Sequence, residues 1–176
     1  MSSVKIETAT ADHVGGIVAI MESAYRGDDS RKGWTTEADL IDGARTSVPE
    51  MLASLNDPKT YTLVAKTDGD VLVGCASITF DGPACIFGKF AVDPTQQAGG
   101  IGKLLLAAAE AAAKSHFGVS TMTMTVIDGR TELEAFYERR GYARTGNVVY
   151  MADIHTGDDM TVGHDLVLNE YAKSLT

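Results

Sequence analysis

The feature that most constrains this chain is a glycine-containing turn between an apolar run and an alanine-rich segment. It extends from Phe90 to Leu105 and reads FAVDPTQQAGGIGKLL, so that Asp93-Pro94 ends a strand and three glycines precede a helix. The first turn of a helix leaves its N–H groups without intrahelical partners, and glycine lets a ligand approach them closely. The turn therefore predicts a cradle for a phosphate or pyrophosphate, with Lys103 adding one local charge.

Two general phosphate-binding motifs fit this turn poorly. A P-loop needs a glycine where Gln97 stands and a hydroxyl residue where Leu104 follows the Gly-Lys pair. A dinucleotide fingerprint needs a third glycine where Leu105 stands, although Asp128 could take the place of the ribose-binding acid. A helix start that needs glycines only for its turn is a further interpretation.

The composition indicates one globular domain over residues 1–176. Hydrophobic residues make up 44% and charged residues 22% of the chain, which excludes disordered and collagen-like classes. A formal net charge of −9 would repel nucleic acid, so we expect no such partner. No apolar run reaches about 18 residues and no basic leader is seen, so we expect a soluble, cytoplasmic protein without a membrane partner. Cys75 and Cys85 lie in apolar runs and should be buried, reduced thiols.

The order of the predicted elements indicates a mixed α/β (α+β) fold. We expect a mostly antiparallel central sheet of six to seven strands with helices on both faces. The strands that end at Val92 and Ile127 should pair in parallel, because a helix crosses between them. Strands are predicted near 4–9, 61–66, 71–80, 84–92, 120–127, 143–149 and 165–171, and helices after 12, near 37–43 and 49–55, from 101, and over 131–139. The last helix should end at a left-handed Gly141.

Two motifs in this order resemble one enzyme family. Residues 97–102 read QAGGIG, which fits the pattern Q-x-x-G-x-G directly after the strand that ends at Val92. Here the chain resembles the GNAT superfamily of acetyl-CoA-dependent N-acetyltransferases, whose pyrophosphate loop has this pattern. Residues 133–142, LEAFYERRGY, are similar to the family's second signature, a helix with F-Y-E-x-x-G-[FY]. The resemblance implies the GNAT fold, with splayed central parallel strands, and acetyl-CoA as the cofactor.

The resemblance also implies a binding site made mostly of main chain. Amides of the glycine turn would bind the CoA pyrophosphate, and the end of the preceding strand would pair with the pantetheine arm. Arg130 stands where many members have an asparagine that contacts this arm, so it would reach a cofactor phosphate or the substrate, or lie on the surface. Arg139 and Arg140 are weaker candidates for the 3′-phosphate. The implied cofactor-binding residues are Phe90, Ala91, Val92, Gln97, Ala98, Gly99, Gly100, Gly102, Lys103, Arg130 and Tyr137.

The expected chemistry is direct attack of an amine on a thioester. This attack develops an oxyanion, for which the amide of Val92 is the natural donor. The leaving thiolate needs a proton, and Tyr137 matches the family's tyrosine in that role; packing of Tyr137 in the core is the alternative. No general base is evident, and Glu37 and Asp81 are possible relays. The four histidines have no ligand spacing, so we predict no metal site.

The acceptor groove of the family lies largely after the first helix. There Tyr25, Trp34 and Glu37 could form an aromatic wall and a carboxylate for an amine, although Trp34 could instead anchor a loop. We expect a small-molecule primary amine as the acceptor, and a protein N-terminus or lysine second. A CoA-binding sensor that has lost turnover is a different class of function, and a homodimer is expected from the resemblance only.

Overall fold

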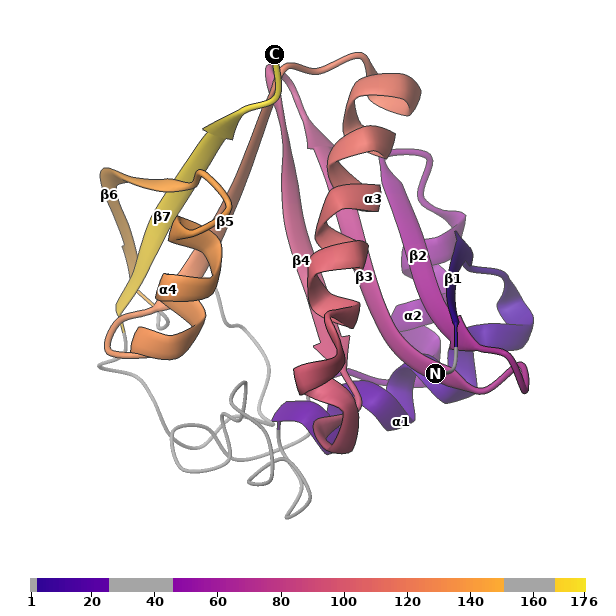
Figure 1. The fold of residues 1–176 in the computed structure, drawn as a ribbon. Helices are drawn as coiled ribbons and strands as arrows, with labels where there is room; N and C mark the ends of the chain where they lie inside the picture. Colours follow the sequence, from indigo (N-terminus) through magenta and orange to yellow (C-terminus); the bar gives the residue numbers. More distant parts are fainter. Residues whose placement is uncertain (1–2, 26–45, 151–166) are drawn as a thin grey trace.

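The computed structural model describes residues 3–25, 46–150 and 167–176, which form a seven-stranded sheet and its covering helices (Figure 1). The elements in chain order are β1 (Val4–Thr8), η1 (Ala11–His13), α1 (Val14–Tyr25), α2 (Val48–Asn56), β2 (Thr60–Thr67), β3 (Leu72–Asp81), β4 (Ala84–Val92), η3 (Pro94–Gly99), α3 (Ile101–Phe117), β5 (Thr121–Ile127), α4 (Thr131–Glu138), β6 (Ala143–Tyr150) and β7 (Val167–Ser174). The strand order is β1-β2-β3-β4-β5-β7-β6.

The sheet consists of two antiparallel halves that meet at a short parallel junction. Strands β1 to β4 pair antiparallel in sequence order, and β7 pairs antiparallel with both β5 and β6. Strands β4 and β5 are parallel, and their register comprises Cys85 with Met122 and Ile86 with Thr123. From this junction the two strands diverge (Figure 1). The predicted mixed sheet, with a splayed parallel pair at its centre, is confirmed.

Helices cover both faces of the sheet, because the strands alternate their apolar side chains between two cores. On one face, Val73 of β3 packs in a core with Leu105 of α3 and Leu133 of α4. On the other face, Cys75 of β3 packs in a core with Met21 of α1 and Met51 of α2. Both cysteines are buried free thiols, as expected. No helix within the described ranges is long and apolar enough to cross a membrane.

Local sequence signals explain where the helices begin and end. The hydroxyl of Ser47 accepts the backbone N–H of Glu50 at 3.3 Å and so caps α2. Helix α3 ends at Gly118, which adopts a left-handed conformation. After α4 the chain turns through Gly141 at φ +97°, which confirms the predicted left-handed position.

The predicted end of β7 is wrong by three residues, and one predicted helix lies outside the described residues. Strand β7 extends to Ser174, three residues past the predicted end, because it pairs with β5 from Leu168 to Ser174. Its last residues include polar Lys173 and Ser174, so the alternation of apolar side chains does not reveal them. The helix predicted over 37–43 falls between the described ranges.

Candidate active site

The glycine turn presents the amino end of α3 without a side-chain cap. Gly100 is the N-cap residue of α3 and lies in the left-handed region at φ +76°, with open space where a Cβ would stand. The first turn of α3 contains no acidic residue. The nearby carboxylate of Asp93 is engaged elsewhere, because it accepts the N–H of Thr95 at 2.9 Å and its hydroxyl at 2.8 Å. This helix end therefore suits an anion, as the sequence predicts.

Gly102 brings three elements together beside this helix end. A Cβ at position 102 would lie 2.9 Å from Cζ of Phe90 and 3.5 Å from Cζ of Phe136. The rings of Phe90 and Phe136 stack with centroids 5.8 Å apart. The absence of a side chain at Gly102 thus allows α3 to start directly against rings of β4 and α4. A diphosphate fits this arrangement, because the backbone is accessible at Gly100 and is packed against two rings at Gly102.

A β-bulge interrupts the pairing of β4 with β3 near the end of β4. Cys75 pairs with Ala91 and Ser77 pairs with Gly88, so β4 has one residue more than β3 over this interval. Lys89 in the bulge adopts φ +47°, and the thiol of Cys75 donates to its carbonyl at 3.3 Å. Sequence reasoning missed this bulge, because lysine carries no signal for a left-handed backbone.

The register of β4 determines the direction of the Val92 amide. Val92 pairs with Gly74 of β3, and the next amide, that of Asp93, donates to the carbonyl of Val73 at 2.8 Å. Adjacent residues of a strand direct their N–H groups to opposite sides. The N–H of Val92 therefore points away from β3, toward the side on which β4 and β5 have diverged.

Tyr137 lies on the inner face of α4, against the aromatic residues of β4. Its side chain is buried, with 4% exposure. Its ring centroid lies 6.2 Å from that of Phe87, 6.4 Å from that of Phe90 and 5.9 Å from that of Tyr142. Helix α4 thus carries Tyr137 to the same region as the β4 bulge and the start of α3.

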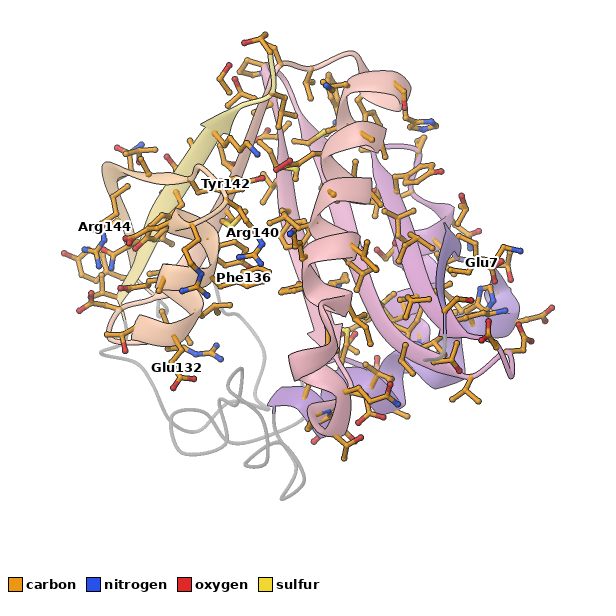
Figure 2. All side chains as sticks on the ribbon, in the orientation of Figure 1. Glu7, Glu132, Phe136, Arg140, Tyr142 and Arg144 are labelled. Carbon is orange, nitrogen blue, oxygen red and sulfur yellow. The ribbon has the colours of Figure 1, made fainter. Side chains whose placement is uncertain are left out.

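A cavity of about 400 Å³ runs along α4 and is lined by Thr131, Glu132, Ala135, Phe136 and Arg139. Figure 2 shows Phe136 and Arg140 extending from α4 toward α3. The guanidinium carbon of Arg140 lies 3.9 Å from the centroid of the Phe136 ring, and its Nη1 donates to the Phe136 carbonyl at 2.8 Å.

Burial lowers the pKa of Arg140, and the charge of Arg139 lowers it further. Both arginines therefore lie where a negatively charged ligand would relieve their repulsion. Arg130 is the N-cap residue of α4 and is half-buried.

A polar network between α4 and the strands β6 and β7 holds this helix against the sheet. Nη2 of Arg144 on β6 lies 3.2 Å from both carboxylate oxygens of the buried Glu134. Nε of Arg144 donates to the hydroxyl of Tyr171 on β7 at 3.0 Å, and this hydrogen bond raises the pKa of Arg144. The helix that carries Tyr137 is therefore held by charged hydrogen bonds as well as by apolar packing.

The structure brings together some of the predicted site residues and separates others. The end of β4, the glycine turn and Tyr137 lie close together, because the ring of Phe90 contacts both Gly102 and Tyr137. Asp81 is the last residue of β3 and pairs with Ala84 at the start of β4, so it is remote from Val92 at the other end of that strand. Tyr25 is the last residue of α1, and its side chain is not described; Trp34 and Glu37 lie outside the described residues. Gln97 and Ala98 belong to η3, and Gly99 ends it.

Comparisons with known proteins agree on the family. The model of the acetyltransferase (GNAT) family matches residues 22–142, more than half of the chain. A search among curated protein sequences found no match.

Solved structures with the same fold cover nearly all of the chain. The putative acetyltransferase yncA from Salmonella typhimurium, solved with acetyl-CoA, is 19% identical with a TM-score of 0.72, over 99% of this chain and 95% of that one. The ribosomal-protein-S18-alanine N-acetyltransferase from Escherichia coli is 14% identical with a TM-score of 0.71, over 99% and 95%. The chain therefore belongs to the GNAT family of acetyltransferases, enzymes that transfer an acetyl group from acetyl-CoA to an amine.

Proposed function

We propose that this protein acetylates a primary amine of a small molecule, and that the amine attacks the thioester of acetyl-CoA directly. The bound coenzyme supplies the acetyl group as an activated thioester. The observation that carries the proposal is the position of Tyr137, which is buried against Phe87 and Phe90 beside the bulged end of β4. A tyrosine in this position can give a proton to a leaving thiolate.

The direction of the main chain supports the remaining proposed roles. The N–H of Val92 points to the diverging side of β4, where it would donate to the carbonyl oxygen on which negative charge develops. The main chain of Phe90 and Ala91 would hold the pantetheine arm. The amides from Ala98 to Lys103 would bind the diphosphate at the start of α3. The cavity along α4, with Arg139 at its wall, offers space for the remaining phosphate.

Two features of the chain support the proposed acceptor: its net charge, and the residues that end and follow α1. A net charge of −9 favours the approach of a cationic amine. Tyr25, Trp34 and Glu37 remain the proposed acceptor residues, with Glu37 as the proton relay. Structures with the same fold include a spermidine N-acetyltransferase SpeG chimera from Vibrio cholerae and hSSAT, which is 12% identical with a TM-score of 0.71, over 98% of this chain and 95% of that one.

A protein amine is the second candidate acceptor, since the Escherichia coli enzyme of this fold is named for an alanine of ribosomal protein S18.

An assay of thiol release separates these possibilities. The protein is mixed with acetyl-CoA and each of two probes: spermidine, and a peptide with an N-terminal alanine. Faster thiol release with a small amine supports the proposal, and release with the peptide alone favours a protein acceptor. Binding of CoA without amine-dependent release from a wider amine library would indicate a sensor rather than an enzyme.

A further inference from the structure

Beyond the short parallel junction of β4 and β5, the two halves of the sheet are joined by the aromatic packing of α4 against β4. The half with β1 to β4 carries α3, which packs on these strands and begins at the glycine turn. The other half, with β5, β7 and β6, carries α4 and Tyr137. The relative position of these halves sets the distance between the phosphate-binding helix end and Tyr137.

The carboxylate of Glu110 connects the two halves away from the junction. Glu110 lies on α3, and its Oε1 accepts Nζ of Lys173 on β7 at 2.8 Å, while Oε2 lies 3.1 Å from the same nitrogen. Oε1 also accepts the hydroxyl of Tyr142 at 3.1 Å. The side chains of Glu110 and Lys173 are 17% and 28% exposed, so water screens this pair less than a surface pair.

Tyr142 extends the connection to Tyr137. Tyr142 is buried, and its ring centroid lies 5.9 Å from that of Tyr137. Its backbone N–H donates to the carbonyl of Tyr137 at 3.2 Å. Figure 2 shows Tyr142 between α4 and α3. Burial raises the pKa of Tyr142, and the charge of Glu110 raises it further, so the hydroxyl stays protonated and can donate.

We propose that Glu110 is a positioning residue that holds the half of the sheet carrying Tyr137 at a fixed distance from α3. The inference rests on the proposed function, because it explains how Tyr137 is kept in place relative to a coenzyme bound at the start of α3. A shift of about 1 Å between reacting groups can cost up to about 100-fold in rate, so a tie of this kind affects turnover more than binding.

A distance measurement tests whether Glu110 holds the two halves of the sheet together, without any assay of activity. Nitroxide labels are placed on exposed cysteines introduced as Ser115→Cys on α3 and Glu138→Cys on α4, since the native Cys75 and Cys85 are buried. Pulsed electron paramagnetic resonance should give a broader distance distribution in Glu110→Ala than in the labelled parent. The matched control is Glu7→Gln, which removes a 2.7 Å ion pair with Lys66 that lies within one half. Equal distributions for Glu110→Ala and the parent would overturn the proposal.

Kinetics with acetyl-CoA and the best amine of the probe set test the functional part. We expect Glu110→Ala to lower kcat about 10-fold. The KM for acetyl-CoA should change less than about 2-fold, because the amides proposed to bind the diphosphate belong to the start of α3 and stay in place. Glu110→Gln keeps an acceptor for Tyr142 and should retain more kcat than Glu110→Ala. If Glu110→Ala does not fold, the same kinetic constants are measured for Lys173→Met and Glu110→Gln instead.

Unchanged kcat in these variants, beside an active parent, would overturn the positioning role. An inactive parent that does not bind CoA would instead refute the proposed function, and the distance measurement would still decide the tie.

Discussion

The ring of Phe90 closes directly over Gly102, so that β4 and the first turn of α3 touch at a position with no room for a side chain. A Cβ on Gly102 would approach Cζ of Phe90 to 2.9 Å, a separation that requires the ring or the helix to move. The contact therefore holds the end of α3 that is proposed to bind the diphosphate against the strand that is proposed to bind the pantetheine arm.

Replacement of this glycine should affect both stability and coenzyme binding. We expect Gly102→Ala to lower the free energy of unfolding by about 1–3 kcal/mol, because the added methyl overpacks a buried contact. The affinity for CoA should also fall, because the displaced helix start carries the amides that are proposed to bind the diphosphate. Urea denaturation and calorimetry measure the two effects.

The control for this substitution is Gly15→Ala in α1, where a Cβ meets open space. Alanine is the better helix former there, so Gly15→Ala should stabilise the protein by about 0.5–1 kcal/mol. A Gly102→Ala variant as stable as the parent would contradict the packing described for Phe90.

Tyr137 should matter for turnover and little for coenzyme binding. We expect Tyr137→Phe to lower kcat at least about 10-fold, because the variant lacks the proton for the leaving thiolate. The KM for acetyl-CoA should change less than about 2-fold, since the ring and its packing remain. Steady-state thiol release measures both constants. Tyr150→Phe, on an exposed residue of β6, is the matched control; a turnover equal in the two variants would remove the assignment.

The left-handed backbone at Lys89 should have a measurable effect on the free energy of unfolding. The residue lies in the β4 bulge at φ +47°, a conformation that costs a side-chain-bearing residue about 1–2 kcal/mol relative to glycine. We therefore expect Lys89→Gly to be more stable than Lys89→Ala by about 1 kcal/mol, as measured by urea denaturation. The comparison of two truncations removes the contribution of the lysine side chain. An alanine variant as stable as the glycine variant would show that the bulge has a different backbone in solution.

Tyr142 should make the protein sensitive to alkaline pH. Its pKa is raised above the ordinary value of 10.0, chiefly by burial, so the folded state binds the phenol proton more tightly than the unfolded state. Its contribution to stability is present below pH 10 and is lost as pH rises further, with a slope of up to about 1.4 kcal/mol per pH unit.

The slope is measured by chemical denaturation at pH 9, 10 and 11. The stability of Tyr142→Phe should fall less steeply above pH 10 than that of the parent. Identical slopes would mean that the phenol of Tyr142 ionises as readily in the folded protein as in the unfolded chain.

The sequence predicts the fold well, because its signals are local. Alternating strands, the left-handed Gly141 after α4 and the glycine turn depend on neighbouring residues, and each reappears in the structure. The parallel pairing of β4 and β5 could also be inferred, since a helix must cross between them. The site was predictable in part, because the turn and Tyr137 belong to recognisable motifs.

Features that depend on long-range packing could not be predicted. The bulge at Lys89 arises from the register between β3 and β4. The sequence has no glycine at this position that would indicate a left-handed backbone. The contact of Glu110 with Lys173 joins residues 63 positions apart. A hint was present, because Glu110 is the sole acid of the alanine-rich α3, but its partners follow only from the fold.

Calorimetric titration of the unaltered protein with CoA tests the central claim most directly, with pantetheine as the comparison ligand that lacks the diphosphate and the nucleotide. If the amides at the start of α3 bind the diphosphate, CoA should bind with measurable heat and a stoichiometry of one per chain. Pantetheine should bind far more weakly. Absence of heat with CoA, or equal affinity for pantetheine, would contradict the account.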